Sequence, residues 1–207
     1  MKKKILFIAV ILVVSTLILT ACNLIPGSSD VYEELNEKVK MDYNMISMET
    51  QTTYNGVTLV DKYNANKGAN STMVSYSTER LATIEKDANG NYVAPKDMIV
   101  KKSGSATIQN GAIVEQSGDV IDLPITKLEE INLKFNEKYF TDVKTYAEGV
   151  SDVFEAKVST PWAFLDNPDF HGKDMSVVVR YGEKLSSVMV DYTSQNGATV
   201  KVIYKFM

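Results

Sequence analysis

Regular alternation of apolar and polar side chains is the feature that most limits how this chain can fold. Near the C-terminus, Val200, Val202, Tyr204 and Phe206 occupy every second position. A period of two places these side chains on one face of a β-strand and the polar ones on the other. One buried and one wet face is typical of an antiparallel sheet covered on one side. The expected strands of this C-terminal meander span 175–181, 185–193 and 198–206.

Four Asn-Gly pairs mark turns along the chain, at 55–56, 89–90, 110–111 and 196–197. Asn and Gly both tolerate the positive φ angles that the central residues of a type I′ hairpin turn require. About ten strands are expected in all, because short alternating runs recur between the turns. The remaining strand candidates span 41–54, 57–64, 72–85, 105–109, 112–116, 128–135 and 153–158.

A single helix is predicted ahead of the strands. Asp30 is a favourable N-cap and Glu33 follows it at the capping-box position. Val31, Leu35 and Val39 then form one narrow apolar stripe at helical spacing, which is sufficient for packing on a sheet.

The predicted fold class is therefore α+β and mainly antiparallel β. We expect a curved sheet or half-barrel of about ten strands with one N-terminal helix. Residues 161–170 are aromatic and contain two prolines. They predict a covering loop or a short second helix, since proline is excluded from the interior of a sheet.

The first 22 residues form a segment of a different kind. Lysines at 2–4 precede an apolar run over 5–19, and small residues follow it. This order is typical of a secretory signal, and the run is short for the alternative, a transmembrane anchor. The sequence Leu19-Thr20-Ala21-Cys22 resembles the lipobox of bacterial lipoprotein precursors.

The lipobox resemblance implies a modification at Cys22. A diacylglyceryl group would be attached to the thiol, and prolipoprotein processing enzymes would cleave before Cys22. The implied organisation is a signal peptide over 1–21, a lipidated tether over 22–29 and a single domain over 30–207. Acyl chains such as palmitate would then hold the protein on the extracytoplasmic face of the cell membrane.

A helix followed by an antiparallel sheet in an exported chain is similar to the LolA-like half-barrel lipoprotein carriers. The run over 192–198, continuing into Tyr204 and Phe206, is also similar to uncharacterised exported lipoproteins of low-GC Gram-positive bacteria. The half-barrel resemblance implies a concave face that holds lipid. A LolA is itself a soluble carrier, whereas this chain would carry its own lipid.

Composition excludes several classes of protein. One cysteine and one histidine cannot form an internal disulfide or a four-ligand Cys/His metal site. A net charge of −4 argues against nucleic-acid binding.

Candidate catalytic groups gather only near the single histidine. His171 has Asp166, Asp169 and Asp174 nearby in sequence, which allows a histidine oriented by a carboxylate. No nucleophile motif accompanies it, so a loop histidine is favoured. The same acidic residues do not match the spacing of an EF-hand Ca²⁺ loop. No catalytic residue, metal or cofactor is predicted.

Apolar side chains suggest a pocket under the helix, with a plain core as the alternative. Methionine recurs in the expected strands, and it is common at adaptable apolar binding surfaces. The methionines concerned are Met41, Met45, Met48, Met73, Met98, Met175 and Met189. The side chains predicted to line the pocket are Trp162, Phe164, Leu165, Tyr192 and Tyr204.

Three functions remain open at this point. The first is a non-catalytic lipoprotein that binds a lipid or another apolar ligand in the concave face of its sheet. The second is a structural or protein-interaction module of the cell envelope, without a ligand cavity. The third is a surface hydrolase. Tyrosines could supply an interaction surface for the second function: Tyr32, Tyr43, Tyr54, Tyr63, Tyr76, Tyr92, Tyr139, Tyr146 and Tyr181.

Overall fold

The structure is a computed structural model that describes residues 29–54, 56–81, 85–86, 88–89, 92–93, 99–124 and 132–207. Cys22 and the signal segment lie outside the described residues. The helices are α2 (Ser29–Val39), α4 (Pro161–Phe164) and the 3₁₀ turn η2 (Glu137–Tyr139). The strands are β1 (Met45–Tyr54), β2 (Val57–Lys67), β3 (Thr72–Leu81), β4 (Glu85–Lys86), β5 (Tyr92–Val93), β6 (Ile99–Gln109), β7 (Ala112–Gly118), β8 (Phe140–Glu148), β9 (Ser151–Val158), β10 (Lys173–Tyr181), β11 (Leu185–Thr193) and β12 (Thr199–Phe206).

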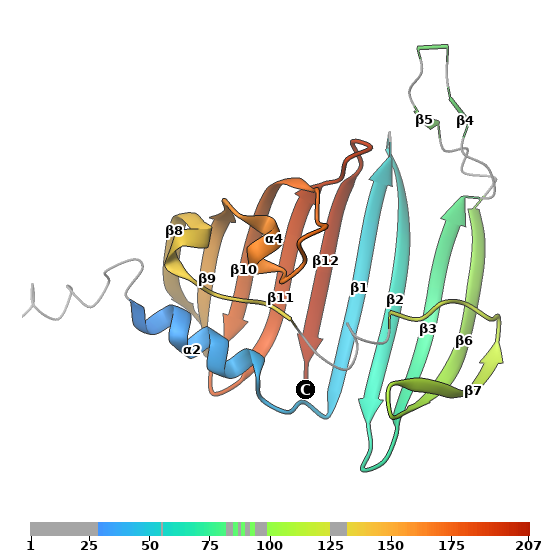
Figure 1. Cartoon of the computed structure of the whole chain (residues 1–207), viewed down its shortest axis with the longest axis horizontal. Coiled ribbons are helices and arrows are strands. Elements are labelled where there is room, and N and C mark those ends of the chain that lie inside the picture. The colour runs from blue at the N-terminus through green and yellow to red at the C-terminus, as the bar shows by residue number, and fades with distance from the viewer. Residues whose placement is uncertain are drawn as a thin grey trace, which may run out of the picture.

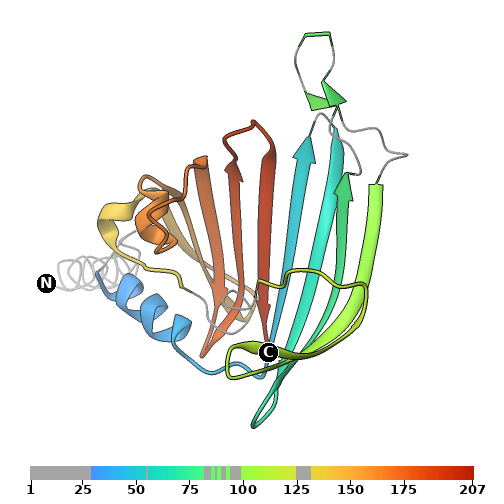
Figure 2. The same cartoon turned by 45° about the vertical axis from the view of Figure 1, so that its right-hand side comes forward.

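One antiparallel sheet of ten strands dominates the fold, in the order β7-β6-β3-β2-β1-β12-β11-β10-β9-β8. It consists of two meanders, which meet where β1 pairs with β12. The sheet is open and curved, and α2 lies across the concave face of the C-terminal meander (Figures 1 and 2). The predicted fold class is confirmed.

In the C-terminal meander, buried side chains alternate with partly exposed ones, as the sequence predicts. Along β10, Met175, Val177, Val179 and Tyr181 are buried, while the residues between them are partly exposed. These side chains face the concave side, where Val188 of β11 lies opposite Val179. Burial of branched apolar side chains on one face stabilises the sheet through the hydrophobic effect.

The α2 stripe packs on this meander as its spacing predicts. Val31 and Leu35 are buried, and Val39 packs against the same cluster. Tyr32 widens the stripe, because its ring stacks on Phe140 with centroids 5.9 Å apart. The helix is therefore held by a broader apolar face than the sequence pattern suggests.

Asn36 attaches one side of α2 to an extended segment at 132–136. Its Nδ2 donates to the carbonyl oxygen of Phe135 at 2.7 Å, and its Oδ1 accepts from the Phe135 N–H at 2.9 Å. The Asn36 side chain thus satisfies the N–H and C=O groups of Phe135, which no described strand pairs with.

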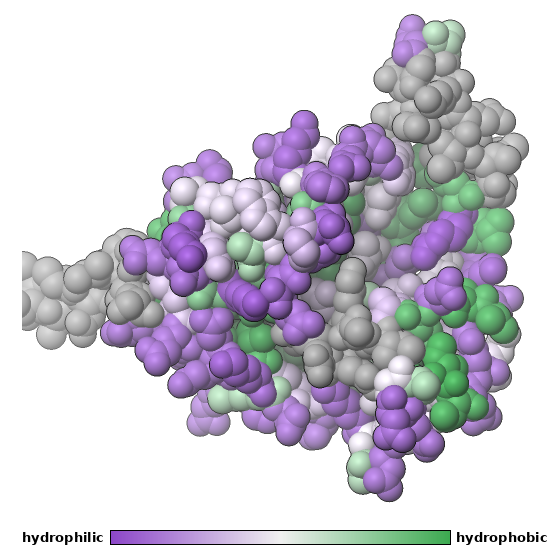
Figure 3. Space-filling view, viewed as in Figure 1, coloured by the Kyte–Doolittle hydropathy of each residue, from purple (hydrophilic) through white to green (hydrophobic). Residues whose placement is uncertain are grey.

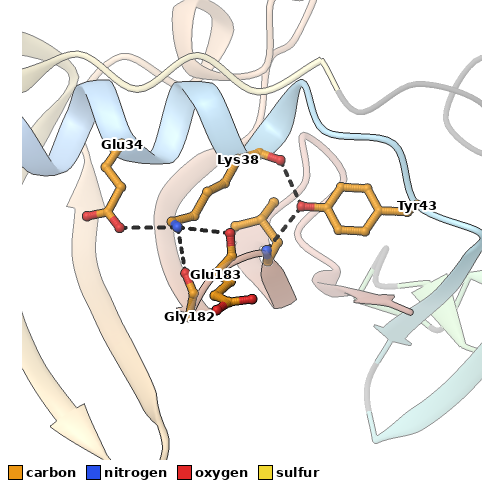
Figure 4. A network of polar contacts seen from close by, with 6 residues as sticks. Glu34, Lys38, Tyr43, Gly182 and Glu183 are labelled. Atoms are coloured by element: carbon orange, nitrogen blue, oxygen red, sulfur yellow. Dashed lines mark hydrogen bonds and ion pairs between the residues drawn. The ribbon is translucent and has the colours of Figure 1, made fainter.

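Lys38 and Tyr43 attach the other side of α2 to the turn between β10 and β11 (Figure 4). The buried Lys38 ammonium donates to the Gly182 carbonyl at 2.5 Å and pairs with Glu34 at 3.2 Å. The Tyr43 hydroxyl donates to the Lys38 carbonyl at 2.7 Å and accepts from the Leu185 N–H at 3.0 Å. The end of the helix is thereby fixed to the sheet on both sides.

Irregular strands contribute to the curvature of the sheet. Asp142 in β8 and Asp174 in β10 both have φ of 54°, and the register of each strand shifts there. Such bulges bend a strand and increase its twist. Both bulges lie toward the same end of the C-terminal meander, next to the end of β9.

Several predicted elements differ from the structure. A strand over 128–135 is wrong for 132–135, which pairs with no strand and instead bonds to Asn36; residues 125–131 lie outside the described residues. β8 was not predicted, and β6 begins at Ile99 rather than at 105. The turn prediction at Asn110 and Gly111 is confirmed, since their φ angles are 51° and 72°.

Candidate functional site

The lower part of the concave face is filled. In the N-terminal meander, a buried cluster is closed by the chain that follows β7, through Ile121 and Leu123. The C-terminal meander is covered by α2 and by Phe164 of α4. The cluster of the N-terminal meander comprises Met48, Tyr63, Ala65, Val74, Tyr76, Ala106 and Ile108.

Above this filled part, many concave side chains are partly buried or exposed, although Thr78 and Val200 stay buried. Strand register extends the same face toward the end of the sheet that carries the β1–β2 turn, at the top of Figure 1. We call this region the upper concave face. It comprises Thr50, Thr52, Leu59, Asp61, Arg80, Val100, Lys102, Tyr192, Val202 and Tyr204.

Two tyrosines mark the boundary between the filled and open parts. Burial raises the pKa of Tyr204 to about 12, and the neighbouring Tyr192 adds to this effect. Burial also raises the pKa of Tyr192. Tyr192 is fixed by the ring of Phe170, whose centroid lies 5.0 Å away in an edge-on arrangement. Both hydroxyls therefore stay protonated at neutral pH and can donate a hydrogen bond.

Gly172 allows Phe170 to approach Tyr192 closely. A Cβ on Gly172 would lie 2.7 Å from the Tyr192 ring, so a larger residue would displace one of the two aromatic side chains. The loop before β10 thus supports one wall of the upper concave face.

The other wall carries charge. Arg80 Nη1 lies 2.5 Å from Asp61 Oδ1, with 57% of the Arg80 side chain exposed and 19% of Asp61. The hydrogen bond from Arg80 to Asp61 keeps the pKa of the guanidinium above its usual value. Lys102 is exposed on the same face. The upper concave face is therefore largely uncharged, with charged side chains along its margin on β2, β3 and β6.

Of the side chains predicted to line a pocket, two share the concave face. Tyr192 and Tyr204 lie there, and their role in lining a ligand site stays a prediction. Phe164 is fully buried in the core against Phe135, and Leu165 packs on the same cluster. Trp162 is 51% exposed on α4, so it contributes no buried pocket wall.

The methionines do not gather at a site. Met48 and Met175 are buried in the two clusters. Met73 is 62% exposed and Met41 is 39% exposed. Met189 pairs with Ile203 on the convex side of the sheet. Met98 lies outside the residues whose placement is described. The described methionines fill gaps and cover surface rather than forming an adaptable pocket.

Sequence reasoning missed Leu59, Arg80 and Lys102 as parts of this face, whereas Val202 is predicted on the same strand face as Tyr204. Period-two counting from the buried Tyr63 and neighbouring core positions would have found each one within its own strand. Counting within one strand does not give the register between strands, and it is this register that brings the four strands together.

The remaining polar candidates do not form a centre. His171 is exposed, and its imidazole makes no polar contact with another described residue. Asp166 pairs with Lys134 at 2.6 Å. Among the described residues, no group of three or more metal-ligating side chains comes together. Within the same residues, no helix has the length and apolarity needed to span a membrane.

No family model matches the chain, and no curated protein matches it either. The upper concave face is therefore the feature from which a function is inferred.

Proposed function

We propose that this protein is a non-catalytic lipoprotein that binds a lipid or another apolar ligand on its upper concave face. The observation that carries the proposal is a difference in burial between the lower and upper parts of the concave face. The lower concave side chains are buried by the protein's own elements, whereas Thr52, Leu59 and Val202 are only partly covered by described residues.

Partly covered apolar side chains on a concave surface favour such a ligand. A ligand removes apolar area from water at roughly 25 cal/mol per Å², and a curved wall lets it contact several strands at once. The protonated tyrosines at the boundary add hydrogen-bond donors that orient a polar group. The helix is attached on both sides through Asn36 and Lys38, which favours a preformed rather than an induced site.

Native mass spectrometry tests the binding directly. The full-length chain is released from a neutral detergent after incubation with a bacterial lipid extract. We expect an added mass of several hundred daltons that disappears on denaturation. Leu59→Asn should reduce the bound fraction, while Val60→Asn is the matched control, because Val60 points to the convex side. An apo mass under all conditions would refute ligand binding.

Lipidation at Cys22 is part of the same proposal and needs its own test. Cys22→Ala should abolish incorporation of labelled palmitate and leave an uncleaved or released chain. A processed Cys22→Ala protein that stays on the membrane would refute lipid anchoring at this residue. The measurement is a fractionation of cells grown with the labelled fatty acid.

One observation favours a second candidate, an interaction module. β7 is an outer strand of the sheet, and it exposes Ile113 and Val114, at 37% and 56%. A free edge of this kind can pair with a strand of another chain. The tyrosines offer little support, since Tyr32, Tyr43 and Tyr63, among others, are buried. A persistent apo mass would direct attention to this edge.

A further inference from the structure

We propose that the ligand is an amphiphile with an anionic headgroup, and that Arg80 and Lys102 hold this headgroup at the margin of the upper concave face. This inference rests on the proposed function and names the chemical class of its ligand.

Strand register puts both cations on the concave side. In β6, Lys102 lies two residues from Gly104 and four from the buried Ala106, so it shares their face. In β3, Arg80 follows Tyr76 and the buried Thr78 on the same side. The pairing of β3 with β6 runs without interruption from Thr72 to Leu81, so no bulge reverses these orientations.

Charge on the upper concave face is confined to its margin. Along β11, β12, β1, β2, β3 and β6, the concave positions given by the register carry four charged side chains: Asp61, Arg80 and Lys102 at this margin, and Lys67 at the opposite end of β2. The three charges at the margin sum to one positive charge, in a chain whose net charge is −4. A cationic margin beside an apolar surface is complementary to an amphiphilic anion.

The two cations are available to a ligand in different ways. Lys102 forms no ion pair with any described residue, whereas its neighbour Lys101, on the convex side, pairs with Glu79 at 2.7 Å. Arg80 uses Nη1 for both Asp61 and the Glu79 carbonyl. A guanidinium has five N–H donors, so further donors remain for a carboxylate or phosphate.

Asp61 lies where the backbone pairing between β2 and β3 has ended, and hydrogen bonds to β3 hold it in place. The paired register of the two strands ends at Lys62 and Ser77. Beyond that point, Asp61 Oδ1 accepts from the Glu79 N–H at 3.2 Å, and Glu79 Oε2 accepts from the Val60 N–H at 3.0 Å. Asp61 is thus shared between a backbone donor and Arg80, and it orients the guanidinium without consuming it.

The same rows of the sheet give the apolar part of the ligand a path. Val100 pairs with Arg80 and is 44% exposed. Leu59 and Thr52 are partners on the next two strands, and the open part of the row ends at Val200, which is buried beside Tyr192. In the space-filling view, apolar and hydrophilic side chains lie side by side over β3, β6 and β7 (Figure 3).

The test compares two photoreactive probes with one acyl chain. One is a diazirine-bearing fatty acid, and the other is its neutral glycerol monoester. Each is titrated against the full-length chain in a non-ionic detergent, and the crosslinked peptides are mapped by mass spectrometry. We expect half-maximal labelling by the fatty acid at an about tenfold lower concentration, the factor that one hydrogen bond to a charged group provides.

Variants assign this preference to the two cations. Arg80→Gln and Lys102→Gln should each reduce it, and together they should abolish it while labelling by the neutral probe persists. Lys101→Gln is the matched control on the same strand and opposite face, and it should change nothing. Thermal melts of all variants should agree, because these side chains are exposed.

The outcomes separate the two proposals. Equal labelling by both probes would overturn the anionic headgroup and leave apolar-ligand binding intact. If neither probe labels the chain, both the anionic headgroup and apolar-ligand binding are overturned. Inorganic phosphate at millimolar concentration is the third arm: if it displaces the fatty acid completely, the margin is a site for free anions, and the amphiphile is refuted.

Discussion

The attachment of α2 through Asn36 gives a sharp prediction of stability. Asn36→Ala removes two hydrogen bonds to the Phe135 backbone, at 2.7 and 2.9 Å, both part-buried. Each is worth about 1 kcal/mol net, and the backbone groups left without a partner cost more. Alanine returns about 0.5 kcal/mol through its better helix propensity. We expect a net loss of about 2 kcal/mol.

Urea denaturation followed by circular dichroism measures this loss. With a denaturant slope of about 2–3 kcal/mol/M for a domain of this size, the midpoint should fall by about 0.7–1 M. Asn36→Leu retains side-chain bulk without the hydrogen bonds and should lose a similar amount. Glu37→Ala is the control, because it is exposed on the same helix. If Asn36→Ala lowers the midpoint no more than Glu37→Ala does, the attachment contributes nothing and the reasoning fails.

Three further predictions concern the core and the tyrosines. Phe164→Ala should cost about 3–5 kcal/mol in denaturant unfolding, since Phe164 is fully buried, whereas the exposed Trp162→Ala should cost less than about 0.5 kcal/mol; similar values would contradict this assignment. Because burial raises the pKa of Tyr204 to about 12, the folded chain holds this proton more tightly than the unfolded one, so its contribution to stability is complete below about pH 10 and declines as the pH rises to 12. Tyr204→Phe should make that alkaline decline shallower by at most about 1.4 kcal/mol per pH unit, and an unchanged slope in urea titrations at each pH would count against it. Gly104→Ala should destabilise by about 1–3 kcal/mol, because the added Cβ would lie 2.5 Å from the Tyr76 hydroxyl, and a neutral effect on the melting temperature would show that the site relaxes.

Local patterns were sufficient for several elements. The alternation over β10 to β12, the α2 stripe and the turn at Asn110 and Gly111 all follow from side-chain spacing and backbone preference within one element. Such features depend on a few neighbouring residues, and the sequence contains them all. At β8 and at 132–135, alternation and strand pairing do not coincide. Only Phe140, at the start of β8, is buried, so that strand carries little alternation. Residues 132–135 alternate between polar and apolar side chains as a strand would, but the Phe135 backbone bonds to a helix side chain instead of a strand.

The candidate site depended on contacts that no local pattern contains. The central pairing of β1 with β12 joins opposite ends of the domain, and it decides which side chains share the concave face. Trp162 and Phe164 are two residues apart in a single helical turn, yet one is exposed and the other buried. Arg80 and Lys102 come together only through the register of β3 with β6. The sequence by itself therefore determined the period and position of most elements, because those are set by side chains close along the chain. Only the tertiary structure decided which faces are covered and which charges meet, because that depends on the packing of segments far apart in sequence.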